Sequence, residues 1–325
     1  MEERLFENRV DLTALNESVK KIREEIGHVI VGQQEMIDLL IISILADGHV
    51  LIEGVPGVAK TLTAKLLSRV IDVKFNRIQF TPDLMPSDVI GTSVFNMKNS
   101  EFEFKAGPIF SNIVLIDEIN RAPAKTQAAL FEVMEERQIT ADGTTYRMEH
   151  PYMVVATQNP IEHEGTYRLP EAQLDRFLFK ILVHYPDMEQ EFSIIQGHHQ
   201  RKGHAPVEDV KPVLNTEKIK QYRNAVQQVH VEENLMRYIA QIIYETRNNP
   251  SLFLGASPRA SVALLNSAKA FAAINARDFV TPEDVKFVAA PVLRHRIMLT
   301  PDKEMEGITT DDVVKQIVDK VEVPR

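Results

Sequence analysis

Two patterns of apolar residues divide the chain. Before residue 48, apolar side chains recur every three or four positions, as at Leu12, Leu15, Val19 and Ile22, which predicts amphipathic helices. Between residues 49 and 184, five short apolar runs alternate with helix-like stretches, at 49–53, 75–80, 112–117, 152–157 and 177–183. Strands that alternate with helices predict an α/β fold in which helices cover a parallel sheet.

Two segments interrupt this alternation and are predicted to form β-hairpins. One spans about 92–104, and the other spans 138–148 around Asp142-Gly143, a pair typical of a type I′ turn. Phe95, Phe102 and Phe104 alternate along the first hairpin. Such aromatic residues either pack on the domain that carries the hairpin or contact a partner, and the sequence leaves both interpretations open.

After residue 185 the strand pattern ends and helical periodicity takes over, as at Ile239, Ile242 and Ile243. We therefore predict two domains. Residues 1–185 hold the N-terminal helices and the α/β core, and residues 186–325 form an all-helical domain. The 325 residues are enough for both, since one domain commonly takes ~100–200 residues.

Composition limits the chemistry and the compartment. The sequence has no cysteine, which excludes disulfides, zinc–thiolate sites and cysteine nucleophiles. Its longest apolar stretch, 36–46, contains Asp38 and is shorter than the ~20 residues that cross a bilayer. The first residues lack the apolar run of a secretory signal. We therefore expect a cytoplasmic protein without a membrane span.

Because the net charge is −9, we do not expect a nucleic-acid partner, since proteins that bind phosphate backbones usually carry a basic face. Arg294 and Arg296 are close together in the sequence. A local basic patch is one interpretation of this pair. We favour the other, a helix face near acidic neighbours.

The first candidate site follows the apolar run 49–53. Gly54 and Gly57 lie in a loop that leads through Lys60 and Thr61 into a helical pattern. A loop between a strand and a helix binds phosphate through its backbone N–H groups and the helix N-terminus. Lys60 would reach the β- and γ-phosphates of ATP, and the Thr61 hydroxyl would ligate Mg²⁺.

The candidate nucleotide-binding residues of this loop are Gly54, Val55, Pro56, Gly57, Val58, Ala59, Lys60, Thr61 and Leu62. Ala59 stands where the strict phosphate-loop pattern has glycine. Alanine tolerates helical dihedrals, so we expect Ala59 to adopt them and the departure to be mild.

The second candidate site is an acidic pair, Asp117 and Glu118, at the end of the apolar run 112–117. Ligands of open α/β sheets bind beyond the carboxyl ends of the strands, so this pair is expected beside the phosphate loop. Asp117 would hold Mg²⁺ through its water shell. Glu118 would polarise the water that attacks the γ-phosphate.

Five segments, taken in order, resemble the MoxR family of AAA+ ATPases: 54–61, 115–123, 156–160, 169–177 and 255–260. The resemblance implies a P-loop AAA+ core with a C-terminal helical lid. It also implies ATP hydrolysis with Mg²⁺ in a homo-oligomeric ring, expected to be a hexamer. Family members commonly act with proteins that contain a von Willebrand factor A domain, and they serve in cofactor insertion or complex assembly; the client itself is not implied.

The resemblance also assigns roles to single residues. Asn159 matches sensor 1, which helps to place the attacking water, although an Asn at a strand end also stabilises turns. Arg176 matches the arginine finger that enters the next subunit's ATP site; the alternative is an ion pair with Asp175 or Glu171.

Arg259 matches sensor 2, which reaches the γ-phosphate from the lid. It follows Ser257 and Pro258, residues that can cap and start a helix. A cation in the first turn of a helix is unfavourable unless an anion or carboxylate compensates it. Val31 and Gly32 match the box that covers the adenine, or form a bend packed on the core.

The leading hypothesis is therefore a ring-forming ATPase that remodels or matures a partner protein. One alternative is a DNA-associated AAA+ motor or the ATPase subunit of a chelatase. Another is a nucleotide-gated scaffold that binds ATP but barely hydrolyses it.

Overall fold

The structure is a computed structural model that describes residues 10–98, 100–160, 167, 169–202 and 207–324. Its centre is a five-stranded sheet in the order β2-β5-β8-β1-β9, in which every neighbouring pair is parallel. The strands are β1 (Val50–Gly54), β2 (Phe75–Gln79), β5 (Ile113–Asp117), β8 (Met153–Gln158) and β9 (Phe179–Val183). The predicted α/β fold and its five strands are confirmed.

Side chains alternate between the two faces of this sheet. Val50 and Ile52 of β1 pack on one face, whereas Leu51 packs on the other, and all three are buried. Helices cover both faces, which explains why the strands are continuous apolar runs. They are α1 (Thr13–Gly27), α2 (Gln34–Leu45), α3 (Lys60–Val70), α4 (Pro86–Ile90), α5 (Ala124–Glu136) and the short α6 (Glu171–Leu174), with the 3-10 turn η2 (Ile119–Arg121) before α5.

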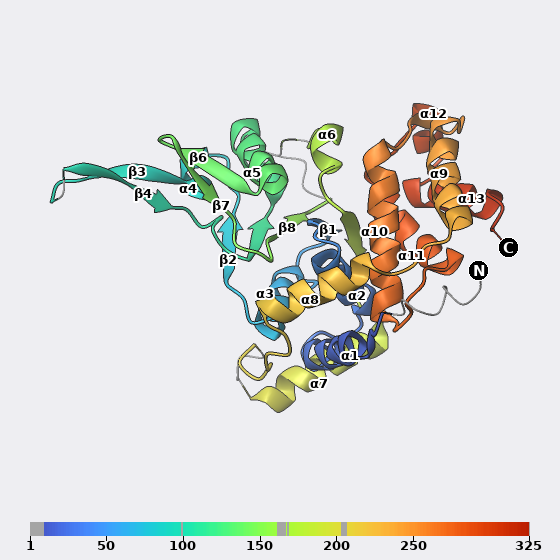
Figure 1. Cartoon of the computed structure of the whole chain (residues 1–325), viewed down its shortest axis with the longest axis horizontal. Helices are drawn as coiled ribbons and strands as arrows, with labels where there is room; N and C mark the ends of the chain where they lie inside the picture. Colours follow the sequence, from blue (N-terminus) through green and yellow to red (C-terminus); the bar gives the residue numbers. More distant parts are fainter. Residues whose placement is uncertain (1–9, 99, 161–166, 168, 203–206, 325) are drawn as a thin grey trace.

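Both predicted hairpins are present, and in Figure 1 they extend from the side of the core away from the lid helices. They are β3 (Gly91–Asn96) with β4 (Glu101–Ala106), and β6 (Gln138–Ala141) with β7 (Thr144–Arg147). Asp142 and Gly143 have φ of 50° and 77°, as a type I′ turn requires. Asn99, predicted at the first hairpin's tip, lies outside the described residues.

The aromatic residues of the first hairpin divide between the two interpretations. Phe104 packs on the molecule itself, because its ring stacks on Tyr146 of the second hairpin with centroids 4.5 Å apart. Phe95 and Phe102 contact each other, yet they are 48% and 72% exposed. Phe104 therefore supports the packed interpretation, and the other two leave the partner interpretation open.

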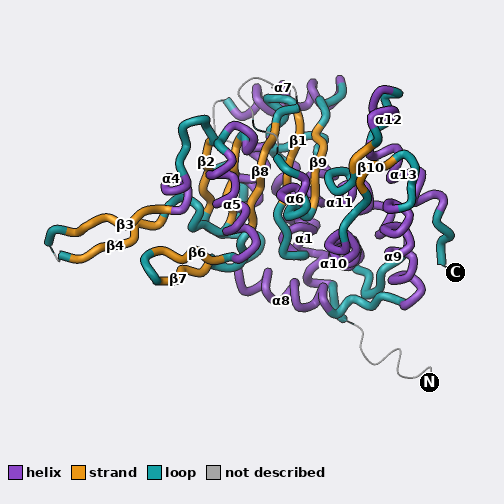
Figure 2. The backbone as a smooth tube through the Cα atoms, turned by 90° about the horizontal axis from the view of Figure 1, so that it is seen from above, coloured by secondary structure: helices purple, strands orange, loops and turns teal. Residues whose placement is uncertain are grey.

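The C-terminal part is helical, as predicted, apart from a two-stranded ribbon. Its elements are α7 (Met188–Arg201), α8 (Thr216–Gln227), α9 (Glu233–Arg247), β10 (Leu252–Leu254), α10 (Pro258–Ile274), α11 (Pro282–Leu293), β11 (Met298–Leu299), α12 (Pro301–Met305) and α13 (Thr310–Lys320). α8 packs on α2, and α10 packs on α1 and α2 (Figure 1), so one apolar core joins the lid helices to one face of the sheet. Figure 2 shows the strands β2, β8, β1 and β9 of that sheet running side by side. The domain boundary at residue 185 stays a prediction. No helix in the described part of the chain has both the length and the apolar character to span a membrane.

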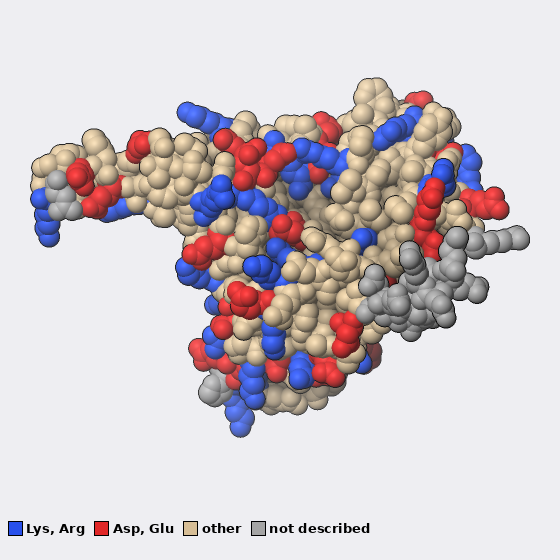
Figure 3. Space-filling view, viewed as in Figure 1, with Lys and Arg blue, Asp and Glu red and all other residues tan. Residues whose placement is uncertain are grey.

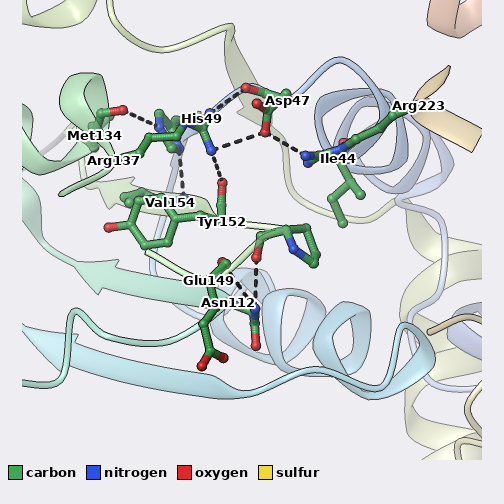
Figure 4. A network of polar contacts seen from close by, with 11 residues as sticks. Ile44, Asp47, His49, Asn112, Met134, Arg137, Glu149, Tyr152, Val154 and Arg223 are labelled. Atoms are coloured by element: carbon green, nitrogen blue, oxygen red, sulfur yellow. Dashed lines mark hydrogen bonds and ion pairs between the residues drawn. The ribbon is translucent and has the colours of Figure 1, made fainter. Parts of the chain in front are cut away.

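A polar network joins the loops that precede the strands (Figure 4). His49 lies before β1; its Nε2 is 3.0 Å from the Met134 carbonyl, and its Nδ1 accepts a hydrogen bond of 3.0 Å from the Val154 N–H. Arg137 donates to the carbonyls of Tyr152 and Asp47, at 2.9 and 2.7 Å. Burial lowers the pKa of His49 to about 3, so the imidazole is neutral.

Candidate active site

The phosphate loop connects β1 to α3 at the carboxyl edge of the sheet, the edge at which the strands end. Gly54 closes β1 beside β9, where an added Cβ would lie 2.7 Å from the Val183 carbonyl oxygen. Gly57 has a φ of 87°, a conformation that L side chains rarely adopt. Both glycines are therefore required by the backbone, and α3 begins at Lys60, as the strand, loop and helix pattern predicts.

Ala59 does not have the helical dihedrals that we expected. Its φ is 60° and its ψ is 19°, which is the left-handed region. A Cβ costs roughly 1–2 kcal/mol in that region, so this is the position at which glycine is favoured. The prediction was wrong because Ala59 precedes the helix and still belongs to the turn of the loop.

Lys60 lies between the ends of two strands. Its Nζ donates to the Gly54 carbonyl at 2.5 Å and to the Gln158 carbonyl at 3.5 Å. Gln158 ends β8, and the next residue is Asn159, which is 8% exposed. The structure therefore brings the lysine of the phosphate loop next to the predicted sensor 1 residue.

Asp117, at the end of β5, is contacted by side chains from two neighbouring strands and from α3. The Thr61 hydroxyl lies 3.4 and 3.5 Å from its two carboxylate oxygens, and the Thr157 hydroxyl donates to it at 3.0 Å. Arg77 of β2 forms an ion pair with it, with Nε 2.5 Å from Oδ2. A hydroxyl beside a carboxylate fits Mg²⁺, which takes few protein oxygens and keeps water and phosphate oxygens as its other ligands. Thr61 and Asp117 are therefore placed to act as one metal site.

Glu118 is held from several directions. Its backbone is left-handed, with φ 57° and ψ 52°, which costs a non-glycine residue energy and recurs at functional sites. Its N–H donates to the Thr157 hydroxyl at 3.1 Å. Gln79 Nε2 donates to its carboxylate at 2.8 Å, and Arg121 forms an ion pair of 3.0 Å with it. These contacts fix the direction of the carboxylate at the carboxyl edge.

Val31 and Gly32 lie on the same side of the molecule as the phosphate loop. Val31 is half-buried, and Gly32 has a φ of 79°. Gln33 donates to the carbonyl of His184, the residue after β9, at 3.4 Å. Because β9 pairs with β1, this bend is near the end of the strand that carries the loop. That placement suits a residue box that covers a base beside the phosphates.

Arg176 and Arg259 lie at the opposite, amino edge of the sheet. Both line a cleft of about 270 Å³ whose other walls include Gly48 and His49, the residues before β1. β1 has five residues and advances about 3.3 Å per residue, so the two edges are roughly 16 Å apart. The structure therefore does not bring Arg259 to the phosphate loop of its own chain, where an arginine reaching in from the lid was expected.

The partner of Arg176 is neither of the carboxylates considered from the sequence. Its Nε is 3.0 Å from Glu135 Oε2, and its Nη1 donates to the Phe131 carbonyl at 2.5 Å. Asp175 instead pairs with Arg296 of the lid, with Nε 2.7 Å from Oδ1. An intramolecular ion pair is thus present, but it joins the arginine to α5.

Arg259 also contacts Glu135, through Nη2 and Oε1. This is the compensating carboxylate that an arginine in the first turn of a helix needs. Pro258 begins α10 as predicted, but the Ser257 side chain does not cap the helix, because its hydroxyl donates to Asp175 at 2.9 Å. The acidic neighbours expected for Arg294 and Arg296 are confirmed as Asp311 and Asp175, but the predicted helix face is wrong, because α11 ends at Leu293 and both arginines follow it.

Sequence reasoning missed four residues of these two edges: Arg77, Gln79, Thr157 and Glu135. Arg77 and Gln79 alternate along β2, and Gln79 is paired in register with Asp117. The alternating polar residues of β2 could therefore have indicated that this strand contributes side chains to the site beside the acidic pair. Glu135 is one of several acidic residues near the end of α5, and nothing in the sequence distinguishes it.

Comparisons with known proteins agree with this geometry. Residues 49–179 match the profile of the ATPase family associated with various cellular activities (AAA), and residues 244–317 match that of the AAA lid domain. The YeaC protein of Bacillus subtilis is 47% identical over 94% of this chain and 94% of its own length. The chaperone MoxR1 of Mycobacterium tuberculosis is 43% identical over 93% of this chain and 81% of its own length.

A solved structure supports the same conclusion. The crystal structure of a candidate ATPase from Cytophaga hutchinsonii superimposes with a TM-score of 0.89 at 43% identity, covering 96% of this chain and 97% of that one. The nucleotide-binding loop, the acidic strand end and the lid lie in the order that the resemblance implied. The chain belongs to the MoxR family of AAA ATPases.

Proposed function

We propose that this protein is a Mg²⁺-dependent enzyme that hydrolyses ATP to ADP and phosphate in a hexameric ring. The observation that carries the proposal is the division of its charged residues between the two edges of one sheet. Lys60, Thr61, Asp117 and Glu118 lie at the carboxyl edge, and an arginine pair lies at the amino edge. Head-to-tail packing in a ring would bring the amino edge of one subunit to the carboxyl edge of the next.

The residues of the phosphate loop bind the β- and γ-phosphates in this proposal, with Lys60 moving from its carbonyl partners onto phosphate oxygens. Mg²⁺, held by Thr61 and Asp117, would neutralise charge on the phosphates. Glu118 accepts a proton from the attacking water, and Asn159 helps to place that water. Arg176 and Arg259 of the neighbouring subunit stabilise charge on the transferred phosphoryl group.

The placement of Arg259 alters the role that the resemblance gave it. An arginine at the amino edge is on the wrong side of the sheet to reach the phosphates of its own chain. Both arginines therefore serve the neighbour's site, and a single subunit has Lys60 but lacks the two arginines that complete its catalytic machinery. Isolated subunits are expected to bind ATP and to hydrolyse it slowly.

Mixed rings test this arrangement. Lys60→Ala, Glu118→Gln and Arg176→Ala rings should each lose at least about 100-fold in phosphate release, because each lacks a group that acts in the transition state. Mixing Arg176→Ala with Lys60→Ala subunits should restore turnover to about a quarter of wild type, since a random interface combines an intact loop with an intact arginine one time in four. Absence of recovery in rings that contain both variants would sink the proposal.

We further propose that hydrolysis drives remodelling or maturation of a partner protein, and that the partner contains a von Willebrand factor A domain. The relative MoxR1 is named a chaperone. On the face seen in Figure 3, basic and acidic side chains are interspersed, which favours a protein over a nucleic acid as client. The Glu118→Gln protein with ATP should retain such a domain on a column, and the same protein without ATP should not. Equal retention in both conditions would contradict a nucleotide-driven cycle.

A further inference from the structure

Glu135 contacts Arg176 and Arg259, two of the arginines that line the cleft at the amino edge. Its Oε2 lies 3.0 Å from Arg176 Nε, and its Oε1 contacts Arg259 Nη2. Arg176 lies in the core, between the short helix α6 and strand β9, whereas Arg259 belongs to lid helix α10. One side chain of α5 thus joins a guanidinium group of the core to one of the lid.

The guanidinium of Arg176 is fixed by two residues on one face of α5. Phe131 supplies its carbonyl as acceptor and its ring, whose centroid lies 6.0 Å from the guanidinium carbon. Glu135 follows four positions later, on the same side of the helix. The Arg176 side chain is 29% exposed, so it faces the cleft rather than open solvent. α5 therefore sets the direction in which this arginine points.

Two like charges this close repel each other, and Arg259 also lies at a helix N-terminus that disfavours a cation. The Glu135 carboxylate between them offsets both effects. Asp175 does not share this task, because Arg296 and Ser257 occupy its two oxygens. Without the charge of Glu135, the guanidinium groups are expected to separate.

We propose that Glu135 is a positioning residue, which holds Arg176 and Arg259 as a pair so that both enter the neighbouring subunit's ATP site together. This inference rests on the shared active site proposed above. Glu135 itself is at the amino edge and takes no part in the chemistry of its own chain's site. Its effect belongs to the arginine-donating side of each subunit.

The experiment uses Glu135→Gln, which keeps the size of the side chain and removes its charge. Glu136→Gln is the matched control, because it removes the same charge one position further along α5. Glu135→Gln rings should show a kcat about 10- to 100-fold lower with little change in the KM for ATP, as misplaced catalytic groups produce. The control should stay within about 2-fold of wild type, the range expected for an exposed charge away from the arginines. A shorter carboxylate, Glu135→Asp, should recover part of the lost kcat.

Mixed rings then assign the side on which Glu135 acts. Glu135→Gln subunits should regain turnover when mixed with Lys60→Ala subunits, which supply an intact arginine pair. They should not regain it when mixed with Arg176→Ala subunits, because every arginine-donating face is then defective. The reverse pattern would mean that Glu135 acts in its own subunit's site and would overturn the inference. A Glu135→Gln ring with raised turnover would also overturn it, because Glu135 would then restrain the arginines.

The reference mixture separates the two proposals. If Arg176→Ala and Lys60→Ala subunits recover turnover together but Glu135→Gln and Lys60→Ala subunits do not, the role of Glu135 is wrong and the shared site stands. If neither mixture recovers, the shared site itself is wrong. A loss of thermal stability in Glu135→Gln without any recovery on mixing would show a structural role instead.

Discussion

The two edges of the central sheet hold similar charged groups but use them in different ways. At the carboxyl edge, Asp117 and Glu118 receive contacts from β2, β8 and α3, all within the core. At the amino edge, Asp175 and Glu135 receive contacts from the lid as well as the core. In the function proposed above, the first set binds phosphate and metal. The second set joins the lid to the core and holds Arg176 and Arg259.

This difference indicates at which edge a substitution changes catalysis alone and at which edge it also changes stability. Residues of the carboxyl edge lie at the ends of strands whose buried apolar side chains hold the sheet together. Substitutions of these polar residues leave that core in place, so they should affect the chemistry before they affect folding. Residues of the amino edge contact carbonyl groups and carboxylates across the junction of lid and core. Substitutions there should affect the free energy of unfolding as well.

The largest expected effect is the loss of Arg296. Its side chain is 3% exposed, pairs with Asp175, and donates to the carbonyls of Phe177 and Leu178. Burial lowers the pKa of this arginine, whereas Asp175 opposes that shift. Arg296→Ala leaves the Asp175 carboxylate and two carbonyls without their cation, which should reduce the free energy of unfolding by about 3–5 kcal/mol. Urea denaturation measures the change.

The matched comparison is Arg237→Ala, which removes an ion pair with Glu233 on the surface of α9. Both side chains of that pair are more than 70% exposed. Its loss should lower the free energy of unfolding by less than about 1 kcal/mol. Equal effects of the two substitutions would show that the amino edge does not fasten the lid to the core.

The phosphate loop and the acidic pair of the carboxyl edge could be predicted from the sequence, whereas the side chains that contact the acidic pair and the arrangement of the amino edge could not. Gly54, Lys60 and Asp117 belong to contiguous motifs in which each residue type has one chemical use. The partners of Arg176 and Arg259 are brought together by the crossing of α5 and by the docking of the lid, and no local pattern records that arrangement. Even at the carboxyl edge, the prediction for the dihedrals of Ala59 was wrong, because the sequence does not show whether Ala59 is the last residue of the turn or the first of the helix.

A smaller effect should appear when the pH is lowered, through His49 at the amino edge. Its pKa is lowered from 6.5 to about 3 by burial and by Arg137, so the folded state stays neutral where the unfolded chain takes up a proton. The contribution of His49 to the free energy of unfolding is therefore fully present above about pH 6.5. It decreases as the pH drops toward 3, by at most about 1.4 kcal/mol per pH unit.

Unfolding curves of wild type and His49→Gln test this between about pH 6 and pH 5. The stability of the wild type should fall more steeply than that of the variant. Burial also lowers the pKa of His295, but that residue is present in both proteins, so its contribution cancels. Parallel pH dependences would mean that His49 is not the group that titrates.

The smallest effect is the change in stability when glycine replaces a residue with a left-handed backbone, and we expect this change to have opposite signs at the two edges. Ala59 and Arg137 both have left-handed backbones, with φ of 60° and 51°. Ala59→Gly removes a steric cost of roughly 1–2 kcal/mol and adds about 0.5–1 kcal/mol of unfolded-state entropy, so stability should rise by about 0.5–1 kcal/mol. Arg137→Gly relieves the same strain but loses the bonds to the Tyr152 and Asp47 carbonyls, so stability should fall. The melting temperatures of the two variants measure both changes. A higher melting temperature in each would mean that backbone strain at Arg137 outweighs the hydrogen bonds of its side chain. The polar network would then contribute less to the stability of the amino edge than its geometry indicates.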